Sequence, residues 1–105
     1  MNCYKLPLDV ERTVCDLCLG YARRENLLLR GELLPSTAAE FMRLNTAIDE
    51  ALAEECEVAI RKTMLADLGQ RRGHARSPLG IISTNTYKER KKRTKYNIAR
   101  RLSLI

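Results

Sequence analysis

The sequence predicts an all-α fold in a single domain, residues 1–105, and three observations support this prediction. Apolar residues recur at steps of three, four and seven, which is the spacing of one face of an α-helix. β-branched residues never alternate with polar ones over four or more positions, as a half-buried strand would require. The chain has four Tyr, one Phe and no Trp, so its core must be largely aliphatic, which suits packed helices.

The first predicted helix covers about residues 8–30. Pro7 and Asp9 fit its first turn, and Gly31 is typical of the position after a helix C-terminus. Gly20 lies in the helix interior, where it costs about 1 kcal/mol relative to alanine. The apolar face of this helix comprises Val10, Val14, Leu17, Cys18, Tyr21 and Leu28.

A second long helix is predicted from Ser36 or Thr37 to residue 68, the end of the segment 1–68. No Pro or Gly interrupts this part of the sequence. Glu40, three residues after Thr37, would complete a capping box. Alternatively, the helix breaks near residues 54–57, where like charges crowd together. The two helices are expected to form an antiparallel hairpin, and its left-over apolar surface predicts a homodimer.

The segment 69–105 is predicted to be a basic unit that resembles a helix-turn-helix. Residues 69–80 hold three Gly, one Pro and three Arg, which predicts a loop or a very short helix. A helix follows at about residues 84–102, with Ser83 or Thr84 as its N-cap. At 100° per residue, one side of this helix carries Tyr87, Lys91, Thr94, Ile98 and Leu102. The opposite side carries Asn85, Glu89, Lys92, Arg93, Tyr96 and Arg100.

Charge divides the chain at the same place. Residues 1–68 hold 8 Lys or Arg against 12 acids, whereas residues 69–105 hold 11 Lys or Arg against Glu89 alone. Such segregation within a net charge of +6 favours a polyanionic partner for the C-terminal third, with nucleic acid first and an anionic membrane second. The alternative is a basic segment that only keeps the protein soluble.

Duplex DNA suits the terminal helix, because the major groove admits an α-helix and phosphates flank it. The side chains expected to contact base edges are Asn85, Lys88, Glu89 and Lys92. Those expected to contact phosphates are Arg71, Arg72, Arg76, Thr84, Arg90, Arg93 and Tyr96. Glu89 has an equally ordinary alternative, a helix-face ion pair with Arg93.

Residues 82–104 resemble the C-terminal end of RinA/ArpU-type regulators of phages and prophages in Gram-positive bacteria. The matching positions are Ile82-Ser83, Thr86-Tyr87, Arg90 to Arg93, Ile98-Ala99 and Leu102. The resemblance implies a helix-turn-helix similar to region four of sigma factors, which binds promoters of late or structural phage genes. One departure concerns the helix before the turn, since Gly73 and Pro78 would shorten or break it.

The cysteines and the single histidine do not predict a metal site, a cofactor or an enzyme. Cys15 and Cys18 form half of a zinc signature, but they lie within a helical apolar face, where cysteine acts as a small hydrophobic residue. His74 is expected to be a solvated loop residue. No Ser/His/Asp set, carboxylate pair or phosphate-binding loop is recognisable, so we expect no catalysis.

The predicted function is therefore a DNA-binding transcriptional regulator, with double-stranded DNA as partner and a contact with RNA polymerase as a further expectation. We expect the chain to be cytoplasmic and not bound to a membrane, because it has neither a long apolar stretch nor a signal-peptide pattern. The alternative function is a small helical adaptor or inhibitor that binds a protein partner, such as host or phage transcription machinery. RNA binding by the basic helix is a third possibility.

Overall fold

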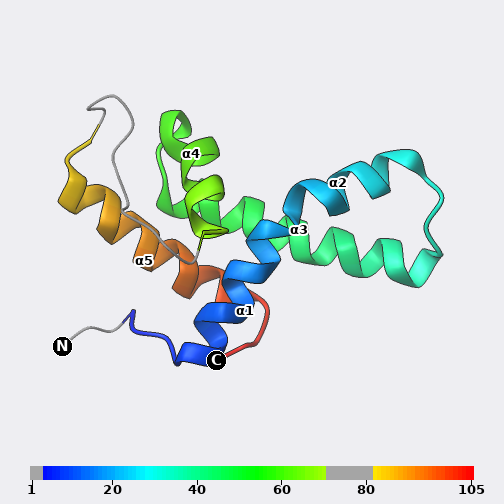
Figure 1. The fold of residues 1–105 in the computed structure, drawn as a ribbon, viewed down its shortest axis with the longest axis horizontal. Coiled ribbons are helices and arrows are strands. Elements are labelled where there is room, and N and C mark those ends of the chain that lie inside the picture. The colour runs from blue at the N-terminus through cyan, green and yellow to red at the C-terminus, as the bar shows by residue number, and fades with distance from the viewer. Residues whose placement is uncertain (1–3, 71–81) are drawn as a thin grey trace.

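The computed structural model describes residues 4–70 and 82–105, which form a bundle of helices (Figure 1). The helices are α1 (Leu8–Leu19), α2 (Tyr21–Arg30), α3 (Pro35–Glu55), α4 (Val58–Leu68) and α5 (Thr84–Arg101). No strand occurs in either described range, and the predicted all-α fold is confirmed.

The predicted helix over residues 8–30 is wrong in one respect, because Gly20 divides it into α1 and α2. The side chain of Arg24 folds back over this break and is only 4% exposed. Its guanidinium donates hydrogen bonds to the carbonyl oxygen of Leu17 and, at 2.7 Å, to Oδ1 of Asn45. A Cβ atom at Gly20 would lie 2.7 Å from Arg24 Nη1, so a larger residue at this position would have to displace the end of the Arg24 side chain.

The second predicted helix is also divided, at the alternative break near residues 54–57, which is confirmed. Cys56 has an extended backbone between α3 and α4. Arg61 bridges the break, because its Nε donates to the carbonyl oxygen of Cys56 at 3.0 Å and its other nitrogen, Nη2, donates to that of Ala53 at 3.3 Å. These bonds satisfy carbonyl groups that the end of α3 leaves without a helical donor.

The predicted capping box at the start of the second helix is wrong. This helix begins at Pro35, whose missing N–H and fixed φ suit a first helical turn, and no side chain caps it. Glu40 instead forms an ion pair with Arg43 at 2.6 Å on the exposed side of α3. The predicted stop at Gly31 is confirmed, since Gly31 follows α2 with φ of 69°, which glycine adopts without strain.

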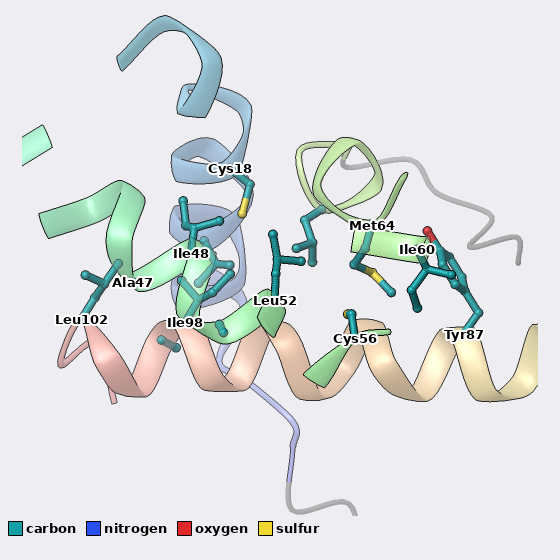
Figure 2. Packing of buried hydrophobic residues seen from close by; sticks show 14 residues of the cluster. Cys18, Ala47, Ile48, Leu52, Cys56, Ile60, Met64, Tyr87, Ile98 and Leu102 are labelled. Carbon is teal, nitrogen blue, oxygen red and sulfur yellow. The ribbon is translucent and has the colours of Figure 1, made fainter. Parts of the chain in front are cut away.

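The core lies where α5 crosses α1, α3 and α4 (Figure 2). Tyr87, Ile98 and Leu102 point from α5 toward α3 and α4 in this view. The hydroxyl of Tyr87 donates to Asp67 Oδ2 at 2.5 Å, so the one polar atom of this fully buried ring is satisfied. All five residues predicted for the inner side of this helix are buried: Tyr87, Lys91, Thr94, Ile98 and Leu102.

The connected end of the predicted hairpin projects from this core as an arm made of α2 and the first half of α3 (Figure 1). We call residues 21–44 the arm. Between residues 25 and 44 it holds eight large apolar side chains, and none of them is buried. Leu29, Leu34 and Met42 are 80%, 72% and 58% exposed. The described residues therefore leave an apolar surface on the arm uncovered.

Candidate nucleic-acid interface

The orientation of α5 is fixed at its N-terminus by a side-chain cap. Ser83 Oγ accepts a hydrogen bond from the backbone N–H of Thr86 at 3.1 Å, as the sequence predicted for one of its two cap candidates. Ser83 Oγ also donates to Thr86 Oγ1 at 2.8 Å. Because the inner side of the helix is buried from Tyr87 to Leu102, the outer side has one defined direction.

The outer face of α5 carries the four side chains predicted to contact bases. Asn85, Lys88, Glu89 and Lys92 are all exposed, and at 100° per residue they fall within an arc of about 100°. We call these four residues the outer face. Together they offer two cations, an amide and a carboxylate, which is a donor and acceptor set able to discriminate base edges.

The flank of α5 that faces α3 is neutralised by acids of α3 and its C-terminal end. Arg90 forms an ion pair with Glu57 at 2.9 Å, and Arg93 Nε lies 3.2 Å from Glu55 Oε1 without making a hydrogen bond. Two of the residues predicted to contact phosphates are therefore occupied within the chain. Arg93 also pairs with Glu55 rather than with Glu89, so the helix-face pair proposed for Glu89 is not formed.

The same flank continues to the C-terminal end of α5. Arg101 pairs with both Glu50, at 2.5 Å, and Glu54, and its Nε donates to Asn97 Oδ1 at 2.8 Å. The Asn97 amide in turn donates to Glu54 at 2.8 Å and to Glu55 at 2.9 Å. We call this network, from Glu50 to Glu57 against Arg90, Arg93 and Arg101, the acidic seam. Hydrogen bonds from Asn97 and charge from Arg101 lower the pKa of Glu54.

Tyr96 and Thr84, also predicted to contact phosphates, lie about three turns apart on the helix. Thr84 is exposed in the first turn. Tyr96 is half-buried, because the ring of Tyr4 packs edge-on against it with centroids 5.5 Å apart. The guanidinium of Arg93 lies over the Tyr4 ring, 5.8 Å from its centroid. The N-terminal segment thus covers part of α5 beyond the outer face.

Other predicted contacts lie outside the described residues. These are Arg71, Arg72 and Arg76, together with His74 and the short helix expected near residues 75–80.

The cysteines of the described residues are packed as core side chains. Cys15, Cys18 and Cys56 are buried thiols. Burial, reinforced by the neighbouring Cys15, raises the pKa of Cys18 to about 12, so this thiol is protonated at neutral pH. Within residues 4–70 and 82–105, no three His, Cys, Asp or Glu side chains are grouped as metal ligands.

Sequence reasoning missed two sets of contacts, the acids that pair with α5 and the buried Arg24 at the break between α1 and α2. The acids from Glu50 to Glu57 were interpreted only as a cause of a helix break, and Arg24 was not singled out at all. A signal was available for the acids, because a dense acidic run and a dense basic helix in one small chain favour contact with each other. No comparable signal marks Arg24, whose burial depends on the break at Gly20.

Comparisons of the chain with protein-family models, curated proteins and solved structures find no match. None of the helices in the described part of the chain has the length and hydrophobicity needed to cross a membrane.

Proposed function

We propose that this chain binds duplex DNA and regulates transcription, reading base edges with the outer face of α5. The observation that carries the proposal is the fixed exposure of Asn85, Lys88, Glu89 and Lys92 on a helix whose opposite side is buried. A helix anchored in this way enters a major groove in one orientation, which sequence reading requires. The resemblance to RinA/ArpU-type regulators supports a phage or prophage origin.

The excess of cations supports the same partner. Lys88, Lys92 and Arg100 are exposed on α5, and no ion pair joins any of them to another described residue. Their charge adds to that of three arginines between residues 71 and 76. Attraction to phosphates gives affinity that falls with salt, whereas contacts of the outer face would give sequence preference.

Selection of bound sequences from a random duplex pool, followed by fluorescence anisotropy at physiological salt, tests the proposal. We expect an enriched motif, and we expect Asn85→Ala and Lys92→Ala to reduce the preference for it by about 1–3 kcal/mol per lost base contact. Lys62→Ala is the matched control, because Lys62 is an exposed cation on α4. Equal affinity for selected and random duplexes would contradict sequence reading. Preferential binding of duplex RNA in competition would identify RNA as the partner instead.

A second candidate function, contact with a protein partner, is favoured by the arm. Leu29 and Leu34 are exposed close to each other in the sequence, and grouped exposed apolar side chains mark protein contacts. RNA polymerase or another regulator retained from nuclease-treated lysate would support this function if Leu29→Lys abolished the retention. Retention that is unchanged by the substitution would exclude the arm as the contact surface.

A further inference from the structure

The two flanks of α5 differ strongly in charge. The hollow on the acidic seam is lined by the acids Glu54, Glu55 and Glu57 and by two cations, Arg90 and Arg93. On the opposite flank, α5 faces α1 and the N-terminal segment across two hollows of about 430 and 230 Å³, which share Glu11 and Lys95. The described residues lining these two hollows include one acid, Glu11, and five cations, which are Lys5, Arg12, Lys91, Lys92 and Lys95. We call this flank the basic groove.

Only one of these five cations has an acidic partner among the described residues. Lys95 Nζ forms an ion pair with Glu11 Oε1 at 2.8 Å, at the boundary between the two hollows. Lys5, Arg12 and Lys92 are exposed. The basic groove therefore retains a surplus of positive charge, whereas the acidic seam has none.

Lys91 gives the groove an internal cation. This side chain is only 9% exposed, and no hydrogen bond or ion pair joins it to another described residue. Burial, followed by repulsion from Lys95, lowers its pKa. An anion bound in the adjoining hollow would favour the charged form of this largely buried side chain.

We propose that the basic groove binds the phosphates of one DNA strand beside α5, and that the acidic seam faces away from the DNA backbone. The inference rests on the proposed function and adds to it a direction of approach. Lys92 belongs to both the outer face and the groove, so a helix in the major groove would bring a flanking strand over Lys5 in the same hollow and Arg12 in the adjoining one. Phosphates approaching the other flank would meet Glu54, Glu55 and Glu57 instead.

The test uses the whole chain and a short fluorescein-labelled duplex of random sequence, because phosphate contacts do not depend on sequence. We expect Lys5→Ala and Arg12→Ala each to weaken binding about threefold or more, and each to reduce the slope of log affinity against log salt by about one. Lys62→Ala, which removes an exposed cation on α4, should leave both quantities unchanged.

A variant that strengthens binding guards against effects of misfolding. Glu11→Gln removes the one acid described in the groove and releases Lys95, so we expect affinity to rise about threefold. Glu32→Gln makes the same charge change at an exposed site beyond α2 and should have a smaller effect. Glu57→Gln releases Arg90 on the acidic seam, and a larger gain from it than from Glu11→Gln would overturn the inference.

The failure of the proposed function and the failure of this inference give different results. If the wild-type chain does not bind the duplex at low salt, the proposed function is wrong and the groove has no DNA to bind. If the wild-type chain binds but Lys5→Ala and Arg12→Ala behave like Lys62→Ala, DNA binding stands and the groove is not its phosphate site.

Discussion

Removing Arg24 should destabilise the fold more than removing any exposed arginine. This side chain is 4% exposed, and it donates to Leu17 O across the break between α1 and α2 and to Asn45 Oδ1 on α3. A hydrogen bond from a charged donor contributes about 1.5–3 kcal/mol to stability. Desolvation of the guanidinium, which lowers the pKa of Arg24, offsets part of the stabilisation from its two hydrogen bonds. We therefore expect Arg24→Met to lower the free energy of unfolding by about 2–4 kcal/mol.

The measurement is urea unfolding followed by circular dichroism at pH 7. Arg23→Met is the matched control, because Arg23 is exposed and its guanidinium lies 5.8 Å from the centroid of the Phe41 ring. We expect this control to cost less than about 1 kcal/mol. Methionine replaces the aliphatic part of the side chain and has no donors, so the difference between the variants reports the loss of the buried guanidinium together with its hydrogen bonds. Equal losses in the two variants would refute the role assigned to Arg24.

Three further predictions concern the arm, the acidic seam and the helix caps. If the arm forms a homodimer, sedimentation should show that Leu29→Lys yields monomer, whereas Val58→Lys, which is 76% exposed on α4, should not. The hydrogen bond from Arg90 on α5 lowers the pKa of Glu57. The contribution of the ionised Glu57 to stability is therefore present at neutral pH and is lost as pH falls below about 4.3. Glu57→Gln should flatten this acid dependence of stability, and an unchanged dependence would exclude the contribution. Ser83→Ala should lower stability by about 1 kcal/mol, whereas Ser36→Ala should not, because the Ser36 side chain caps no helix; equal losses would contradict this assignment.

The sequence was sufficient to predict the regular features that depend on periodicity. The buried side of α5 follows from the spacing of Tyr87, Thr94, Ile98 and Leu102, and its start follows from Ser83. These signals are local, because they require only that a helix has one inner and one outer side. The exposure of the outer face follows from the same spacing.

Features that depend on distant partners could not be predicted in this way. Periodicity continues through Gly20, so the division of the first helix becomes visible only when Arg24 is seen to fold back onto Leu17. The pairing of Arg90 with Glu57 joins residues 33 positions apart, and that of Lys95 with Glu11 joins residues 84 positions apart. A charge count along the chain contains no information about which cations find such partners.

Ion pairs between distant residues change how segregated charge in a small protein is interpreted. An acidic segment and a basic segment that fold together neutralise each other first, and only the remaining charge can attract an external partner. Here the acids from Glu50 to Glu57 bind Arg90, Arg93 and Arg101 on one flank of α5. The surplus of positive charge therefore lies on the other flank, where Lys5 and Arg12 line the basic groove beside α5. Neutralising one flank gives the basic helix a direction, because a polyanion is repelled from the acidic seam and attracted to the basic groove.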